Sequence, residues 1–267
     1  SGGCFNPAVA IGLDLSTGSA PHFEGTGFGW SGPYIAYELT GALLAATFFK
    51  LVRPGDFGGE KSSSCELISE FLGTYMLVLT VGLNVLGKSP AGAFSIAASL
   101  TSMIYALGDV SGAHFNPAVT AAIVASGRCP DLTIPKACCY MGMQILGGIC
   151  ASYTYAFIYS GASFPLGPGK GFNWASVTIA EVVFTFVLCY VVLCVAVSEH
   201  TKASHMFGLA IGSCVTVGGC AIGGISGGSL NPAVSFGIAS SQILNGGYFY
   251  KALLYSAMEC AGGLAAA

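Results

Sequence analysis

The sequence predicts an all-α membrane protein built from long apolar helices and from short helices that re-enter the membrane. Only 8% of the residues are charged and 54% are hydrophobic, whereas a soluble domain carries roughly 25% charged residues. Apolar runs of about 20 residues, long enough to cross a bilayer, recur along the chain. A signature that ends in Asn-Pro-Ala-Val occurs three times, at 1–9, 111–119 and 226–234.

The apolar runs place the predicted spans in chain order. We expect spans near 33–52, 65–87, 90–108, 132–160, 172–198, 204–224 and 246–267. Cytoplasmic connections are enriched in Lys and Arg. If the connection after the first span is cytoplasmic, six of the nine Lys and Arg residues lie inside, so the sequence favours this orientation.

Each signature predicts a loop followed by the start of a helix. A Gly-rich turn precedes an Asn that can cap a helix, and Pro takes the first helical position. The following apolar stretch is too short to span a bilayer. Two such half-helices that meet at mid-membrane place two helix N-termini and two Asn amides at one point, which is typical of a pore. The copies are Asn6-Pro7-Ala8, Asn116-Pro117-Ala118 and Asn231-Pro232-Ala233.

The second and third copies belong to an internal repeat. Asn116 and Asn231 are 115 residues apart. A Glu-x-x-x-Thr pattern recurs 111 residues apart, as Glu70 and Thr74 and as Glu181 and Thr185. Residues 61–267 therefore contain two halves of three spans, each with one half-helix. An odd number of spans per half inverts one half relative to the other in the membrane.

The first copy lies outside this repeat. Asn6 precedes Asn231 by 225 residues, and Glu38-Leu-Thr-Gly41 precedes the comparable Glu259-Cys-Ala-Gly262 by 221. We interpret residues 1–60 as the C-terminal remnant of a preceding unit in a tandem array, and 61–267 as the next, nearly complete unit. In a cyclic alternative, the first half-helix replaces the last one within a single pore.

These motifs together resemble the aquaporin family of water and solute channels. The resemblance rests on the two half-length Asn-Pro-Ala motifs, each preceded by Ser-Gly, on the two Glu-x-x-x-Thr patterns, and on Tyr140-x-x-x-Gln144-x-x-Gly147 in the third span. It implies an aquaporin-like six-span bundle of two inverted three-helix repeats with two re-entrant half-helices. Residues 1–60 add a further half-helix and span. It also implies a lipid bilayer, and a homotetramer with one pore per protomer or an assembly of tandem units.

Physical chemistry supplies a role for the repeated polar residues. Asn116 and Asn231 can each offer an N–H to a passing water oxygen while two half-helix dipoles face it. A water oriented in this way cannot relay a proton, and the positive potential repels cations. The resemblance implies that Glu70 and Glu181 brace the half-helix loops by accepting backbone hydrogen bonds, and we expect Thr74 and Thr185 to accompany them. No role is assigned to Glu38 or Glu259.

The family's constriction uses four positions, and this chain departs from the water-selective pattern there. Water-selective members carry an aromatic residue, a His, a small residue and an Arg. Counting from the Asn pair gives Ile96, Gly219, Gly228 and Val234. This apolar, wide set is closer to vacuolar-type plant members, which also carry Val after the second Asn-Pro-Ala and are associated with urea, ammonia and hydrogen peroxide. Width alone keeps glycerol among the candidate solutes.

The leading hypothesis is therefore a passive channel for water and small neutral solutes that excludes protons and ions. One alternative is a non-conducting homologue with a structural role in the membrane, and another is an ion-coupled transporter that uses Glu70, Glu181 or Glu259. No nucleophile–base pair indicates an enzyme, and no Cys/His cluster has metal-ligand spacing, so we expect neither a metal nor a cofactor. A net charge of -3 gives no reason to expect nucleic acid.

Overall fold

The computed structural model describes residues 3–18, 29–202 and 205–267. The chain divides into two compact units, Ser1–Lys61 and Ser62–Ala267, and each is described by itself. The smaller unit contains α1 (Pro7–Gly18), α2 (Ser31–Val52) and a 3-10 turn at Pro54–Phe57. Hydrogen bonds join its two helices. The backbone nitrogen of Asn6 donates to Glu38 Oε1 at 3.0 Å, and the backbone nitrogen of Ser31 donates to Asp14 Oδ2 at 2.7 Å.

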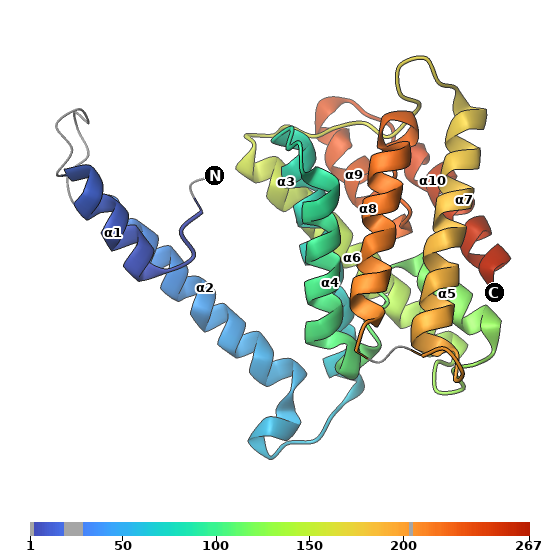
Figure 1. Ribbon diagram of the computed structural model, residues 1–267, viewed down its shortest axis with the longest axis horizontal. Coiled ribbons are helices and arrows are strands. Elements are labelled where there is room, and N and C mark those ends of the chain that lie inside the picture. Colours follow the sequence, from blue (N-terminus) through green and yellow to red (C-terminus); the bar gives the residue numbers. More distant parts are fainter. Residues whose placement is uncertain (1–2, 19–28, 203–204) are drawn as a thin grey trace. The chain divides into compact units, whose positions relative to one another are not determined.

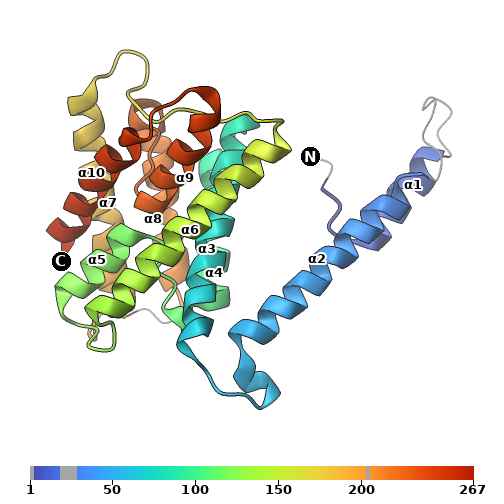
Figure 2. The same cartoon turned by 180° about the vertical axis from the view of Figure 1, so that it is seen from behind.

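The larger unit is a helical bundle in which long helices surround two short ones, α5 and α9 (Figures 1 and 2). A π-helical turn at Leu193–Val197 continues α7, and a 3-10 turn at Ile243–Asn245 follows α9. The described residues contain no strand. The helices are α3 (Ser63–Leu86), α4 (Gly92–Ser111), α5 (Pro117–Ser126), α6 (Ile134–Ile158), α7 (Trp174–Val192), α8 (Phe207–Ser226), α9 (Pro232–Gln242) and α10 (Tyr250–Ala266). Each span that the sequence predicts corresponds to one long helix, which confirms the predicted fold class.

The packing of the helices repeats in the two halves. The first and last helices of each half pack together, α3 on α6 and α7 on α10. The half-helices cross over, because α5 packs on α10 whereas α9 packs on α6. Glycines permit this close approach. A side chain on Gly148 of α6 would collide with the carbonyl oxygen of Ala233, and one on Gly263 of α10 would lie 2.8 Å from that of Ala118.

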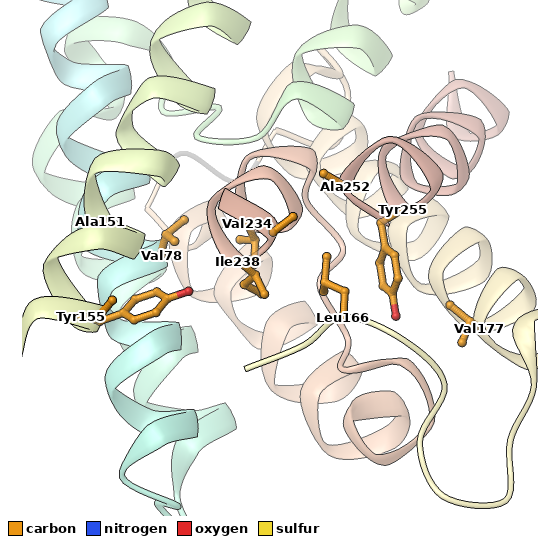
Figure 3. Packing of buried hydrophobic residues seen from close by; sticks show 11 residues of the cluster. Val78, Ala151, Tyr155, Leu166, Val177, Val234, Ile238, Ala252 and Tyr255 are labelled. Atoms are coloured by element: carbon orange, nitrogen blue, oxygen red, sulfur yellow. The ribbon is translucent and has the colours of Figure 1, made fainter. Parts of the chain in front are cut away.

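Buried apolar side chains fix α9 between the two halves. Val234 and Ile238 of α9 lie between Val78 of α3 on one side and Leu166 and Tyr255 on the other (Figure 3). These five side chains are at most 5% exposed. The position of the half-helix is therefore set by packing on both sides, and a change on either side would be felt at its N-terminus.

The outer surface of the larger unit suits lipid. Within residues 3–18, 29–202 and 205–267, five helices are long and apolar enough to cross a membrane, namely α2 of the smaller unit, α3, α4, α7 with its π-helical continuation, and α8. Two more long helices of the larger unit correspond to predicted spans but are less apolar or shorter. Helix α6 carries Lys136, Gln144 and Ser152, and α10 has only 17 residues. Large apolar side chains on the bundle exterior are exposed, such as Phe157 at 86% and Ile134 at 70%. An exposed apolar surface of this kind is expected in a bilayer.

Candidate functional site

The two half-helices of the larger unit each begin at the Asn of a signature. Asn116 Oδ1 accepts hydrogen bonds from the backbone nitrogens of Ala118 at 2.8 Å and Val119 at 3.4 Å. Asn231 Oδ1 accepts one from Ala233 at 2.9 Å. The side-chain oxygens therefore cap the helices as the sequence predicts, and the amide nitrogens are left to point away from the helices.

The structure brings these two Asn side chains together through reciprocal hydrogen bonds. Asn116 Nδ2 donates to the carbonyl oxygen of Leu230 at 2.9 Å, and Asn231 Nδ2 donates to that of Phe115 at 2.8 Å. A side-chain amide carries two N–H groups. One holds the opposite loop, so one on each Asn is available to a molecule that passes between the half-helix N-termini.

An unusual backbone conformation makes the reciprocal bonds possible. Phe115 and Leu230, each directly before the Asn, have φ angles of 49° and 54°. Residues other than Gly rarely adopt this left-handed backbone conformation, which costs about 1–3 kcal/mol per residue and persists only where the surrounding structure stabilises it. It turns each carbonyl towards the opposite Asn, and it leaves each backbone N–H facing the core of its own half.

Buried carboxylates receive those N–H groups. Glu70, which is fully buried, accepts from the backbone nitrogens of His114 at 3.0 Å and Phe115 at 2.8 Å. It also accepts from Ser111 Oγ at 2.6 Å and Gln144 Nε2 at 2.8 Å. Backbone and side-chain donors thus surround this carboxylate, so its charge is well satisfied inside the bundle.

The second carboxylate holds the second loop in the same way. Glu181 accepts from the backbone nitrogens of Ser229 at 3.2 Å and Leu230 at 2.9 Å. The two threonines of the Glu-x-x-x-Thr patterns differ in their contacts. Thr74 donates to the carbonyl oxygen of Glu70 in its own helix, whereas the buried Thr185 hydroxyl has no hydrogen-bond partner in the described part of the chain.

A cavity of about 580 Å³ runs past both Asn side chains. At one end it is lined by Lys88 and Ser89 in the α3–α4 connection, and at the other by Cys129 after α5 and Phe207 at the start of α8. These ends lie at opposite ends of the bundle (Figure 1). The four positions of the expected constriction all line the cavity: Ile96, Gly219, Gly228 and Val234.

Two tyrosines that sequence reasoning left without a role pin the loops. Tyr140 Oη donates to the carbonyl oxygen of Ser111 at 3.0 Å, and Tyr255 Oη donates to that of Ser226 at 2.6 Å. Tyr140 and Tyr255 are 115 residues apart, as are Ser111 and Ser226. The spacing of the Asn pair, applied to the aromatic residues of the last span, identifies the two tyrosines as equivalent. Their bonds to the serine carbonyl oxygens required the structure.

The third copy of the signature has the same local geometry in the smaller unit. Phe5 has a φ of 56°, Asn6 Oδ1 accepts from the backbone nitrogen of Ala8 at 2.9 Å, and Pro7 starts α1. The Asn6 side chain is exposed. The loop and the cap therefore form without the surroundings that bury their counterparts in the larger unit.

Comparison with known proteins agrees with this geometry. The family described as "Major intrinsic protein" matches residues 59–245, which is more than half of the chain. The chain belongs to the major intrinsic protein family. It is accordingly a multi-pass integral membrane protein, and the aquaporin resemblance of its motifs is confirmed at the level of the family.

Relatives named as aquaporins align with much of the chain. It is 34% identical over 203 residues to aquaporin NIP2-1 of Zea mays, and 35% identical over 203 residues to aquaporin NIP2-1 of Oryza sativa subsp. japonica. Each alignment covers 69% of this chain and 64% of the relative. The chain therefore spans less than two thirds of the length of these relatives.

A solved structure supports the fold. The X-ray structure of the aquaglyceroporin from Plasmodium falciparum superposes with a TM-score of 0.64 and 23% sequence identity, and covers 77% of this chain and 94% of that one. The match confirms the aquaporin-like bundle of two three-helix halves with two half-helices.

Proposed function

We propose that residues 62–267 form a passive transmembrane channel for water and small neutral solutes that excludes protons and ions. The observation that carries the proposal is the cavity that passes two half-helix N-termini, where Asn116 and Asn231 each keep one N–H available. The relatives above are named aquaporins, which supports a channel and argues against an enzyme.

Exclusion of charge follows from the same point in the pore. Two helix N-termini face it, and each carries the equivalent of about half a positive charge. A metal cation or hydronium meets this field where the flanking side chains, such as Val234 and Ile238, are apolar and offer no compensating carboxylate. A neutral solute meets only hydrogen-bond donors, so it passes at low cost.

We further propose that Ile96, Gly219, Gly228 and Val234 form the constriction. None of these side chains carries a charge or a strong hydrogen-bond donor, and Gly219 and Gly228 leave space. Solute size then governs selectivity more than polarity. Urea, ammonia and hydrogen peroxide are the expected solutes besides water, and glycerol fits by width, as in the vacuolar-type members to which Val234 points.

Stopped-flow permeability of proteoliposomes tests the proposal directly. We expect water, urea and ammonia to cross faster than in protein-free liposomes, with no increase in proton leak. A protein that inserts correctly but conducts none of them would favour the non-conducting alternative. A flux that needs a proton or sodium gradient would favour a coupled transporter.

A change at Val234 tests the constriction. Val234→Arg adds five N–H donors and a fixed charge, so it should narrow the cavity and reduce urea and glycerol flux at least about tenfold while reducing water flux less. Val9 of the smaller unit holds the same place after Asn-Pro-Ala, and Val9→Arg is the matched control that should leave both fluxes unchanged. If unaltered protein passes water but rejects urea, ammonia and glycerol alike, the wide constriction is wrong.

The smaller unit calls for its own proposal. We propose that Ser1–Lys61 is a second copy of the α9–α10 pair, taken from another channel unit of the same kind, and that channels assemble as tetramers or as tandem units. The shared Asn-Pro-Ala geometry and the contact of Glu38 with the Asn6 backbone support the first point. Removal of residues 1–61 should leave flux per channel unchanged, and loss of all flux would favour the cyclic alternative. The mass of the detergent-solubilised particle tests the assembly.

A further inference from the structure

The polar side chains behind the second half-helix match those behind the first, position by position. Each set runs from the loop residue two places before the Asn, through the residue four places after it, to the last helix of the half and then to the buried glutamate. The first set is His114, Thr120, Gln144 and Glu70, and the second is Ser229, Ser235, Glu259 and Glu181. The first three members of each set are 115 residues apart.

The first set is a closed chain of hydrogen bonds. His114 Nδ1 lies 3.1 Å from Thr120 Oγ1. Gln144 Nε2 donates to Thr120 Oγ1 at 3.0 Å and to Glu70 Oε2 at 2.8 Å. Gln144 is fully buried, and its amide adds a side-chain donor to the backbone donors of the Glu70 carboxylate. This bond holds Glu70 in place beneath the first loop.

The second set repeats the chain up to its last bond. Ser229 Oγ lies 2.7 Å from Ser235 Oγ, and Ser235 Oγ donates to Glu259 Oε1 at 2.8 Å. Glu259 is fully buried. Its other oxygen, Oε2, has no hydrogen-bond donor among the described residues. Glu181, which interacts electrostatically with Glu259, lacks the counterpart of the amide donor that Glu70 receives from Gln144.

The backbone around Glu259 shows that it occupies the place of Gln144. A side chain on Gly147, one turn after Gln144, would lie 2.6 Å from the carbonyl oxygen of Phe71. One on Gly262, one turn after Glu259, would collide with that of Val182. Phe71 and Val182 are themselves equivalent, each directly after the glutamate of its half. Helices α6 and α10 therefore meet α3 and α7 in the same register.

A glutamate in this place cannot donate unless it is protonated. Ionised, it would put two buried carboxylates beside each other, which strongly disfavours one of the two charges. The titratable groups that interact with Glu259 are Glu181 on α7 and Tyr255 and Cys260 on its own helix. Cys189 of α7 packs against the same helix near Gly263. Helices α5 and α9, which pack nearby, contain no titratable side chain. Among the described residues, no basic side chain is therefore part of the group around Glu259.

We propose that Glu259 is a protonated carboxylic acid whose O–H donates to Glu181 as the Gln144 amide donates to Glu70, and that it is a positioning residue for the second half-helix loop. Ser229 lines the cavity. The Ser235–Ser229 hydroxyl pair therefore connects the acid to the pore, and a proton that leaves Glu259 can reach water there. The inference concerns the brace beneath the loop and does not depend on which solutes the channel admits.

The proposal makes the second half of the channel sensitive to alkaline pH. At low and neutral pH the acid keeps its proton, and the bond to Glu181 is present. As the pH rises and Glu259 ionises, the bond is replaced by repulsion between two carboxylates, and the Leu230–Asn231 turn loses its support. Both flux and thermal stability should then fall, whereas the first half, braced by an amide, has no such transition.

Infrared spectroscopy of the full chain in lipid measures the protonation directly. The unaltered protein at neutral pH should show the carbonyl stretch of a protonated carboxylic acid, and Glu259→Gln should remove it. Glu60→Gln, at an exposed loop position, is the matched control and should leave this band unchanged. In Glu259→Gln the amide restores the donor, so thermal stability and flux should persist at a pH where the unaltered protein has lost at least about 4 °C in unfolding temperature.

The reciprocal variant keeps the test independent of how well Glu259→Gln folds. Gln144→Glu should place a second protonated acid in the first half, add to the infrared band, and add a second alkaline transition. The proposal is overturned if the unaltered protein lacks the band at neutral pH, or if Glu259→Gln leaves it in place. Identical alkaline loss of stability in the unaltered protein and in Glu259→Gln would also overturn it.

Discussion

The α1–α2 pair and the α9–α10 pair carry the same signature, yet they differ in how much of it is buried. Phe5 and Leu230 share the left-handed turn, and Asn6 and Asn231 cap their helices in the same way. By contrast Leu13 and Ile238, each seven residues after the Asn, are 50% and 3% exposed. The turn and cap are therefore local properties of the sequence, whereas burial requires the other helices of a complete unit.

The comparison is tested most strongly by the same substitution in both Asn residues. Asn231→Asp removes the N–H that Phe115 accepts and places an anionic oxygen beside that carbonyl, which leaves a buried acceptor unpaired at about 1–3 kcal/mol. It also cancels part of the helix-dipole field. We expect water flux in liposomes to fall, as measured by stopped-flow light scattering, and cation leak to rise, measured for protons with a pH-sensitive dye.

Asn6→Asp is the matched control for that experiment and should change neither quantity. An equal effect of the two substitutions would show that the first signature takes part in the pore, as the cyclic alternative requires. Unchanged leak in both Asn231→Asp and Asn116→Asp would remove the Asn pair from charge exclusion.

A core substitution measures the burial difference itself. Ile238→Ala removes a side chain packed between both halves, and such a change costs about 2–5 kcal/mol in a rigid core. Leu13→Ala at the equivalent exposed position should change stability by less than about 0.5 kcal/mol. Thermal unfolding of the two variants in the same detergent gives the comparison. A matching loss in Leu13→Ala would mean that protein, and not lipid, covers α1 in the assembled form.

The smallest expected effect concerns two equivalent glycines. Gly262→Ala forces a methyl group against the Val182 carbonyl, and overpacking of this kind costs about 1–3 kcal/mol. A methyl group on Gly41 would meet no atom of the described residues within 4 Å, so Gly41→Ala should gain up to about 1 kcal/mol from helix propensity. Unfolding temperatures that shift in opposite directions would support the difference in packing, and a loss in both would contradict it.

Much of the fold was predictable because apolar length and repeated signatures are written along the chain. The spans near 65–87 and 90–108 correspond to α3 and α4 within a few residues. The last helix begins later than predicted, at Tyr250 instead of 246, because the 3-10 turn at Ile243–Asn245 and the left-handed Gly246 separate it from α9. Element ends depend on such local backbone conformations, which apolar length does not encode.

The site was predictable where side chains repeat and was missed where the backbone or a changed residue type carries the contact. Asn116, Asn231, Glu70 and Glu181 recur in recognisable patterns. The carbonyl groups of the residues before each Asn leave no trace in residue identity, so their bonds to the opposite Asn required the structure. Glu259 lies 115 residues after Gln144, the same spacing as that of the Asn pair. Because the two residues differ in type, their equivalence was missed from the sequence.

The reciprocal bonds between the loops also constrain the order in which the protein is made. During synthesis, the carbonyl of Phe115 and the amide of Asn116 face the membrane interior long before their partners exist. Both partners, Asn231 and Leu230, are added only after a further 114 residues or more. The first loop therefore waits in an incomplete state while α6, α7 and α8 insert. Both reciprocal hydrogen bonds form only when the second loop is in place. A chain that ends before the second loop therefore cannot form the Asn pair of the pore.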